Sequence, residues 1–368
     1  MLAHDDMRVN RLLYLFIEKE LSRLFSLQRI EDLFSYRREG EQAFGKYVNS
    51  SNTFCSLVDS GTTGLYLACA LIGIKAGDEV ILPILSWPST VAAVLARGAV
   101  PKFIDIKIDC TLNEQLITTV TSKKTKCIIP VHMYGHAANM ESLVVFAKDR
   151  QLEIIEDCCQ AHGTRIHGKM VGTLGEYGVF SFDPFKTIAT VGTGGAIVYR
   201  KKEYRDDIHA MLSIETANPL VLELHRTPGK MSFTDVAVLK VKLKVATLIE
   251  KKKKLCVARY EEGLRGTPIT FIADQEGVVS IRQSYLVYAP ERDGLLTYLA
   301  KEGIICKEPY APLHRVPLYA QYVGNHLFPM ADYYTKKAII LPLFSMMEPK
   351  EVDIVCGKIR DFYCNSSS

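Results

Sequence analysis

The chain has 368 residues, enough for one large domain and a smaller one, and its 48% apolar and 23% charged residues are typical of a globular protein. A formal net charge of +4 is small for this length, so a nucleic-acid partner is not expected, whereas an anionic small substrate is compatible with it. The apolar stretch Leu12–Ile17 ends at Glu18 and is too short to cross a bilayer, so no membrane partner is expected either.

Residues 57–199 alternate between short β-type runs and helical patterns. The expected strands are Glu79–Pro83, Lys102–Asp105, Cys127–His132, Leu152–Asp157, Tyr177–Phe182 and Ala196–Tyr199, and the expected helices are Gly64–Ile74, Ser89–Arg97 and Met140–Asp149. This alternation predicts an α/β fold with a mostly parallel sheet and helices on both faces.

The pattern changes after about Tyr204. The expected elements are a loop at Thr227–Lys230, one long helix over about 234–264, a strand at Ser284–Tyr288, and helices over about 293–302 and 349–363. The lysine run 251–254 on the long helix is interpreted as a solvated face rather than an anion-binding patch. The sequence thus predicts a large domain, residues 1–230 with an N-terminal helical segment, and a smaller α+β domain, residues 231–368.

The ten cysteines are scattered and include the adjacent pair Cys158–Cys159. They form neither a CxxC motif nor a Cys/His spacing typical of metal ligands. Buried free thiols in a reducing cytoplasm are therefore expected, and no metal site.

Asp157 stands at the end of a buried strand, where open parallel sheets bind ligands. A carboxylate at such a place is costly unless a cation meets it. One candidate cation is a protonated pyridine nitrogen, which would make the heterocycle an electron sink. A cap on the following helix or loop explains Asp157 equally well.

Lys186 lies in a loop after the strand Tyr177–Phe182 and before the small-residue run Gly192–Gly195. A deprotonated lysine amine forms Schiff bases, and this loop is well placed to reach inward. For a lysine taken alone, a solvated surface charge is the more common role.

Two further features belong to the same region. Ser60–Gly64 opens a helix with small and hydroxyl residues, whose free amide groups can bind a phosphate. Trp87 is the only tryptophan, and it either belongs to the core or stacks on a planar heteroaromatic ring.

Seven stretches of the chain, read in order, carry a resemblance to a known family. They are Ser60–Leu65, Ala76–Pro83, Ile129–Gly135, Ile155–Gly163, Phe180–Lys186, Ala311–His314 and Leu341–Leu343. Together they resemble the DegT/DnrJ/EryC1/StrS sugar aminotransferases, enzymes of the aspartate-aminotransferase-like fold (fold type I) that depend on pyridoxal 5′-phosphate. The seven stretches in this order are specific to the family, although no single stretch is.

The resemblance implies a role for each matching residue. Lys186 would carry the cofactor as a Schiff base and shuttle protons, Asp157 would pair with the pyridine nitrogen, and Gln160 would bond the phenolic oxygen. Trp87 would stack on the ring. The residues implied to hold the phosphate are Thr62, Thr63 and Ser181.

Three segments depart from the family pattern. Leu33–Gly40 lacks the Gly-Trp-Leu/Ile-Thr-x-Gly-Pro type segment that helps to shape the substrate pocket. In Lys230–Asp235, Ser232 stands where the family tends to place an asparagine that reaches the partner subunit's phosphate. Glu308-Pro309-Tyr310 replaces a common His-Tyr pair. The core chemistry is therefore expected to be intact and the substrate pocket altered.

The implied activity is transfer of an amino group from glutamate or glutamine to a keto-sugar, expected to be nucleotide-linked, in amino-sugar biosynthesis. A homodimer with shared active sites is implied as well. One alternative is a different carbanion reaction on the same fold, such as a dehydration or amination of a non-nucleotide ketone or cyclitol. A second is a catalytically vestigial binding protein, against which Lys186, Asp157 and Gln160 argue.

Overall fold

The computed structural model describes residues 2–3, 11–48, 53–212, 229–324 and 326–365. The predicted loop at 227–230 lies partly outside these residues. Within them, no helix combines enough length with enough apolar character to cross a bilayer.

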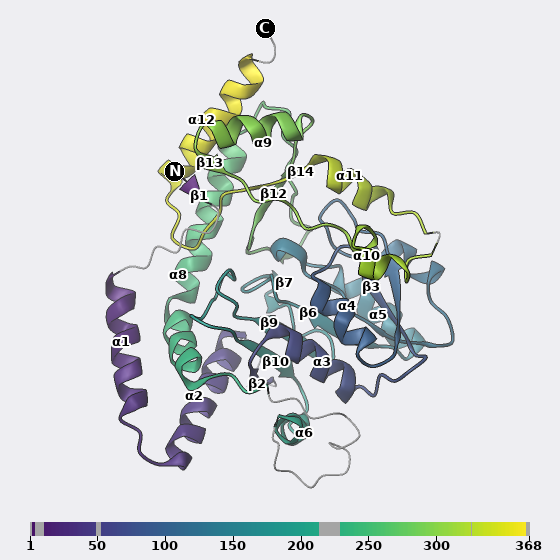
Figure 1. Ribbon diagram of the computed structural model, residues 1–368, viewed down its shortest axis with the longest axis vertical. Coiled ribbons are helices and arrows are strands. Elements are labelled where there is room, and N and C mark those ends of the chain that lie inside the picture. The colour runs from purple at the N-terminus through teal and green to yellow at the C-terminus, as the bar shows by residue number, and fades with distance from the viewer. Residues whose placement is uncertain (1, 4–10, 49–52, 213–228, 325, 366–368) are drawn as a thin grey trace.

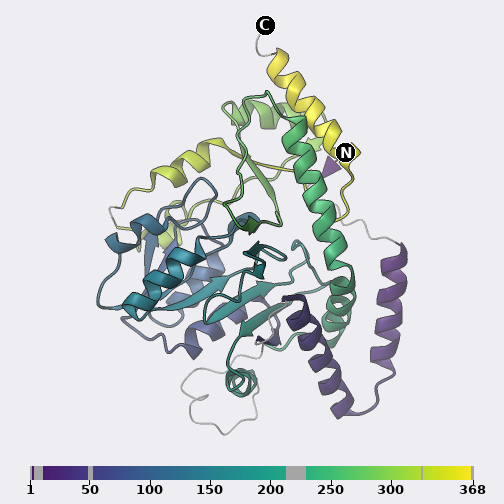
Figure 2. The ribbon, with the colours of Figure 1, turned by 180° about the vertical axis from the view of Figure 1, so that it is seen from behind.

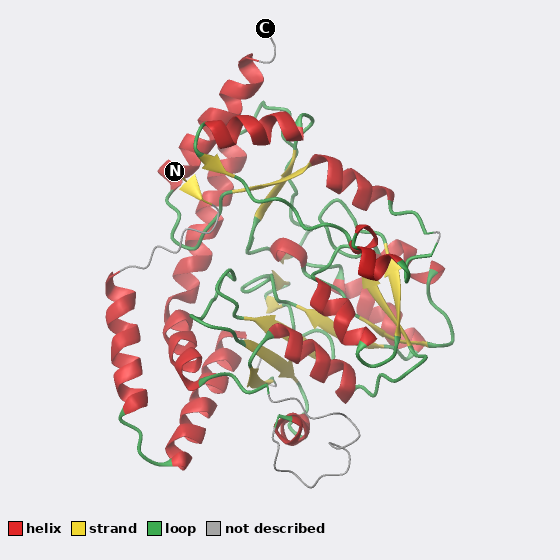
Figure 3. Cartoon of the chain, viewed as in Figure 1, coloured by secondary structure: helices red, strands yellow, loops and turns green. Residues whose placement is uncertain are grey.

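A seven-stranded sheet forms the centre of the molecule (Figures 1 and 3). Its order is β2-β10-β9-β6-β5-β3-β4, with the strands β2 Phe54–Val58, β3 Glu79–Pro83, β4 Val100–Ile104, β5 Thr125–Ile128, β6 Glu153–Asp157, β9 Tyr177–Ser181 and β10 Gly195–Tyr199. Only β10 runs antiparallel to its two neighbours in this sheet. The predicted mostly parallel sheet is confirmed.

Side chains of the central strands alternate between two hydrophobic cores. Val80 and Leu82 of β3 pack into one core with helices α3 (Gly61–Leu71) and α4 (Pro88–Leu95). Ile81 packs into the other with α2 (Ile30–Val48) and α5 (Met140–Arg150). Because both faces are covered, successive side chains in the middle of β3, which are Val80, Ile81 and Leu82, are all apolar. Helices on both faces, as predicted, give the three-layer arrangement of the fold.

The long predicted helix is α8, Phe233–Gly263, which runs along one side of the molecule (Figures 1 and 2). Its first part packs with α2 and α1 (Arg11–Phe25), and its last part with the terminal helix α12 (Pro349–Asn365). The helix thus contributes at one end to the core that contains Ile81 and at the other end to a third core. The domain division at residue 230 stays a prediction.

The interpretation of the lysine run 251–254 as a solvated face is wrong for one residue, Lys253. Lys251 and Lys254 are exposed, as expected of a solvated face, but Lys253 is only 3% exposed. Its ammonium donates to the backbone oxygens of Arg282 and Gln283, at 3.1 and 3.0 Å. The two carbonyl oxygens offset the free-energy cost of burying the Lys253 ammonium, because a buried charge needs hydrogen-bond partners.

The third core holds the C-terminal α+β part, formed by α9 (Arg292–Lys301), α12, and the antiparallel pair β12 (Tyr285–Tyr288) and β14 (Ala338–Leu341). The remaining elements are the strands β1 Leu2–Ala3, β7 Arg165–Ile166, β8 Lys169–Met170, β11 Val278–Val279 and β13 Ile304–Ile305, the helices α6 Tyr204–Met211, α10 Pro317–Ala320 and α11 Pro329–Lys337, and the 3-10 helices Glu114–Thr119, Met133–Gly135 and Leu313–Arg315. The predicted C-terminal strand and helices are confirmed.

Candidate active site

A cavity of about 500 Å³ opens at the carboxyl ends of the parallel strands. The first turn of α3, which follows β2, contributes Thr62, the loop after β3 contributes Trp87, and the end of β6 contributes Asp157. Ser181 at the end of β9 and Lys186 in the following loop also line the cavity. The fold therefore brings residues as far apart in the sequence as Thr62 and Lys186 together at the sheet edge where ligands are expected.

Asp157 is 4% exposed and has two hydrogen-bond donors. Its Oδ2 accepts from the hydroxyl of Thr90 at 2.8 Å, and Thr90 Oγ1 in turn accepts from Ser86 at 2.6 Å. Its Oδ1 accepts from the backbone N–H of Cys159 at 3.1 Å, so Asp157 also caps the following turn. A carboxylate has more acceptor sites than these two, so it can still accept from a cationic N–H in the cavity.

Lys186 is held by its backbone, while its side chain lines the cavity. Its N–H donates to the carbonyl of Asp183 at 2.9 Å. The ammonium group forms no hydrogen bond or ion pair with any described residue, which leaves it available for condensation with a carbonyl compound. The charge of Lys186 also acts on the buried His162. Burial is the main cause that lowers the pKa of this imidazole to about 3, and the charges of Lys186 and Lys253 add to it.

The carboxamide of Gln160 is oriented by the turn after β5. Gln160 is 3% exposed, and its Oε1 accepts from the backbone N–H of Tyr134 at 3.1 Å. Since the oxygen is already engaged, the NH2 end is the one that can donate to a ligand in the cavity. An anionic oxygen would be the fitting partner.

The N-terminus of α3 provides the expected anion-binding position. Ser60 caps the helix by accepting from Thr63 N–H at 3.1 Å, and Thr62 lines the cavity. A Cβ on Gly61 would lie 2.7 Å from Cys159 Sγ, so only glycine fits this close approach. Thr63 is not among the cavity residues, and its hydroxyl donates to Asp59 at 2.5 Å. Its expected phosphate contact stays a prediction.

Trp87 is 51% exposed and lines the cavity, so the alternative that it belongs to the core is wrong. Its ring meets Tyr310 edge to face, with centroids 5.2 Å apart and planes at 70°. Tyr310 stacks on Tyr134 at 5.7 Å. An exposed indole face at a cavity suits stacking on a flat ring, although this role stays a prediction.

Ser232 does not line the cavity of its own chain. It is exposed and caps α8, accepting from the N–H of Asp235 at 3.0 Å and donating to the carboxylate of that residue at 2.7 Å. Asp235 also accepts from the N–H of Gly192 at 2.9 Å, which ties the start of α8 to the loop after Lys186. The expected phosphate contact of Ser232 with a partner subunit stays a prediction.

A buried cluster of His132, Glu156 and Cys158 lies next to the site, with possible ligand atoms within 4.8 Å of one another. His132 Nδ1 accepts from the N–H of Ala138, so its Nε2 carries the proton and donates to Glu156 at 3.1 Å. Glu156 also accepts from three backbone N–H groups of Gly172–Gly175. Burial raises the pKa of Glu156, but these hydrogen bonds outweigh it and the net pKa is lowered. The contacts account for the cluster as a structural network.

Four residues of the site were not predicted. Thr90 is buried behind the cavity and supports Asp157, whereas Gln283, Lys307 and Tyr310 line the cavity and come from the C-terminal part. Thr90 stands shortly after Trp87 in the sequence and could have been noticed together with it. Nothing in the sequence marks Gln283 or Lys307, because their nearness to the site depends on how the C-terminal part packs.

Comparison with known proteins decides the family. The model of the DegT/DnrJ/EryC1/StrS aminotransferase family matches residues 17–360. The chain belongs to this family.

The GDP-perosamine synthase of Escherichia coli O157:H7 is 31% identical to this aminotransferase over 329 residues, covering 84% of this chain and 86% of that one. The pleiotropic regulatory protein of Geobacillus stearothermophilus is 30% identical over 314 residues, 83% of each chain. The X-ray structure of S. venezuelae DesV with a ketimine intermediate has a TM-score of 0.88 at 27% identity, covering 96% of this chain and 95% of that one.

The resemblance seen in the sequence, the fold class and the aminotransferase activity with pyridoxal 5′-phosphate are thereby confirmed. The residues of the cavity also fit this cofactor. A lysine without a partner among the described residues, a buried carboxylate and a glycine-lined helix N-terminus supply the three kinds of contact it needs.

Proposed function

We propose that this aminotransferase moves an amino group from glutamate or glutamine to the keto group of a nucleotide-linked sugar, in amino-sugar biosynthesis. The observation that carries the proposal is the shared cavity of Lys186 and Asp157 at the edge of the sheet. The similarity to a GDP-perosamine synthase supports a nucleotide-linked sugar as acceptor.

When bound, pyridoxal 5′-phosphate supplies an aldehyde that holds the amino group and a ring that withdraws electrons from the reacting carbon. Lys186 would anchor it and would take and return the proton at the substrate carbon. Asp157, held by Thr90 and the Cys159 N–H, would keep the ring nitrogen protonated. Gln160 would donate its NH2 to the phenolic oxygen.

The phosphate would lie at the N-terminus of α3. Thr62 and Ser181 line the cavity there, and the helix dipole favours an anion. The exposed Ser232 would add a contact from the partner subunit of a homodimer. All ten cysteines are free, which supports the proposal of a reducing, cytoplasmic location.

The test begins with the cofactor-loaded protein. Borohydride reduction followed by peptide mass spectrometry is expected to place the cofactor on Lys186, and Lys186→Ala is expected to remain folded without turnover. Lys202→Ala, which changes an exposed lysine outside the cavity, serves as the control. Cofactor fixed on another lysine would contradict the proposal.

Donor spectra separate the remaining alternatives. Glutamate or glutamine is expected to convert the lysine-bound cofactor to its amine form, with loss of the yellow absorption. A loaded enzyme that responds to neither donor would favour another carbanion reaction. A protein that cannot be loaded would favour a vestigial binding role, the candidate raised by the similarity to a pleiotropic regulatory protein.

A further inference from the structure

Gln283 is a buried polar residue that the cofactor contacts do not use. It lines the cavity, is 7% exposed, and comes from the C-terminal part of the chain. Its side-chain Oε1 is fully buried and has no hydrogen-bond partner among the described residues. An unpaired buried carboxamide is costly, so its position at a cavity indicates that a ligand completes its hydrogen bonding.

The backbone of Gln283 is fixed from two directions. Its N–H donates to the carbonyl of Tyr134 at 3.0 Å, and its carbonyl accepts from the ammonium of Lys253 at 3.0 Å. Lys253 is itself buried. The unpaired side chain therefore belongs to a rigid segment, as a recognition residue requires.

Lys307 supplies a positive charge to the same cavity. Its backbone N–H donates to Ile340 of β14 at 3.1 Å, which anchors it to the C-terminal part. Its ammonium lies 5.4 Å from the ring centroid of Phe185, the residue before Lys186. The position next to the reacting lysine brings this cation within the space that a substrate occupies.

We propose that Gln283 and Lys307 form the recognition subsite for the acceptor sugar. The carboxamide of Gln283 hydrogen-bonds a sugar hydroxyl, and the ammonium of Lys307 binds an anionic oxygen of the attached diphosphate. This inference rests on the proposed function and specifies how its acceptor is bound.

The hydrogen-bonding capacity of the two substrates favours the acceptor. A carboxamide offers one acceptor and one donor end, and a hydroxyl can pair with either. The carboxylates of glutamate can only accept, so they cannot pair with the buried Oε1, and among the two donor side chains only the carboxamide of glutamine can. A buried group that recognises a hydroxyl also discriminates strongly against substrates that lack it.

The experiment measures the two half-reactions separately on the cofactor-loaded enzyme, from the change in its absorption. One half-reaction uses glutamate or glutamine. The other runs in reverse with GDP-perosamine and further UDP- and dTDP-linked amino sugars. Calorimetric titration with GDP, UDP and dTDP adds a binding measurement that does not depend on turnover.

Gln283→Met is nearly the same size but cannot form the hydrogen bond. It is expected to raise the half-saturating concentration of the amino sugar about 10-fold or more, while the donor half-reaction changes less than about 2-fold. Lys307→Met is expected to weaken nucleoside diphosphate binding about 10-fold. The controls Gln321→Met and Lys301→Met change exposed residues outside the cavity and are expected to behave as wild type.

Unchanged amino-sugar saturation in Gln283→Met, with an active wild type, overturns the subsite and leaves the proposed function standing. A Lys307→Met variant that loses affinity for glutamate instead of the nucleotide shows that this cation serves the donor, and overturns its assignment. A wild type that converts no amino sugar and binds none of the three nucleotides overturns the proposed function together with the subsite.

Discussion

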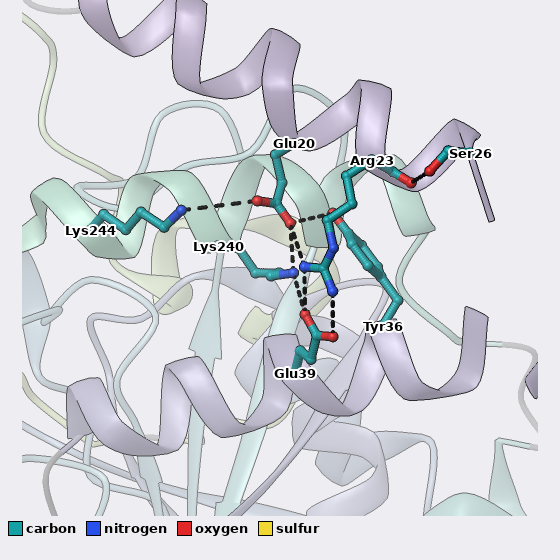
Figure 4. A network of polar contacts seen from close by, with 7 residues as sticks. All are labelled: Glu20, Arg23, Ser26, Tyr36, Glu39, Lys240 and Lys244. Atoms are coloured by element: carbon teal, nitrogen blue, oxygen red, sulfur yellow. Dashed lines mark hydrogen bonds and ion pairs between the residues drawn. The ribbon is translucent and has the colours of Figure 1, made fainter. Parts of the chain in front are cut away.

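Replacing Lys240 with methionine is expected to destabilise the junction of three helices that Figure 4 shows. Lys240 of α8 is 8% exposed, and its ammonium lies 2.6 Å from Glu20 of α1 and 2.7 Å from Glu39 of α2. It also lies 3.9 Å from the ring centroid of Tyr36. One buried cation thus joins helices from distant parts of the chain.

The magnitude follows from what remains after the substitution. Removing one partner of a buried ion pair costs about 3–5 kcal/mol, because the other charge is left unpaired. Here Arg23 still lies 2.7 Å from Glu39, Lys244 lies 3.9 Å from Glu20, and the Glu39 side chain is 37% exposed. These features reduce the penalty, so a loss of about 2–3 kcal/mol in the free energy of unfolding is expected for Lys240→Met.

The pH dependence provides an independent check. Hydrogen bonds from Arg23 and Lys240 lower the pKa of Glu39 from 4.5 to about 2, and the pKa of Glu20 is lowered despite the opposing effect of burial. A lowered folded-state pKa stabilises the protein above pH 4.5, and this contribution is lost as the pH falls toward 2. Lys240→Met is therefore expected to lose less stability over this range than wild type.

Urea unfolding followed by far-UV circular dichroism measures the loss, and hydrogen exchange of α1 and α2 locates it. Lys244→Met, at a site 60% exposed, is the matched control and is expected to change stability by less than about 0.5 kcal/mol. The double variant Glu20→Gln/Lys240→Met removes the unpaired charge and is expected to recover part of the loss. Full stability in Lys240→Met, or no recovery in the double variant, would refute the reasoning.

Three other substitutions test the site. Asp157→Asn is expected to keep the fold and the cofactor but to slow the donor half-reaction about 100-fold, measured by stopped-flow absorption. Ser232→Ala is expected to cost about 1 kcal/mol in urea unfolding through loss of the α8 cap and to release cofactor faster on dialysis, whereas Ser232→Asn is expected to keep both. Burial lowers the pKa of His162 from 6.5 to about 3, so the unfolded chain binds a proton that the folded one does not between these values. His162→Leu is therefore expected to flatten the acid loss of stability in this range by up to about 1.4 kcal/mol per pH unit, and an unchanged slope would contradict this.

The central sheet was predictable because its strands are short apolar runs buried on both faces. Strand β6 ends at Asp157 as the sequence indicates, and this placed the acid at the ligand-binding edge. The antiparallel insertion of β10 between β2 and β9 was not predictable, since strand order depends on pairing between distant segments. Strand β2 itself was not predicted either.

The part of the cavity formed by residues 60–194 was predictable to a larger extent than the part formed by Gln283, Lys307 and Tyr310. Lys186 and Gln160 stand in continuous motifs whose local structure fixes where they point. Gln283 and Lys307 reach the cavity only because the C-terminal part packs against the turn after β5. The turn and strand patterns around Gln283 and Lys307 do not predict that this part of the chain packs against the turn after β5.

The turn at Tyr134 connects Gln160 with the C-terminal residues Gln283 and Tyr310. Tyr134 has φ 56°, a left-handed conformation uncommon for a residue with a side chain, and Gly135 has φ 94°. In this conformation the N–H of Tyr134 donates to Gln160, its carbonyl accepts from Gln283, and its hydroxyl accepts from the N–H of Tyr310.

Gly135 allows the turn at Tyr134 to approach the segment that carries Gln283. A Cβ at position 135 would lie 2.2 Å from the carbonyl oxygen of Ile281. The segment that carries Gln283 is thus held through hydrogen bonds of its backbone, and its side-chain Oε1 adds none among the described residues. A change of side chain at position 283 is therefore expected to affect the proposed acceptor subsite while the backbone contacts of Tyr134 with Gln160 and with position 283 stay in place. The departures from the family pattern around Tyr310 follow the same logic, since that residue is also held through its backbone N–H.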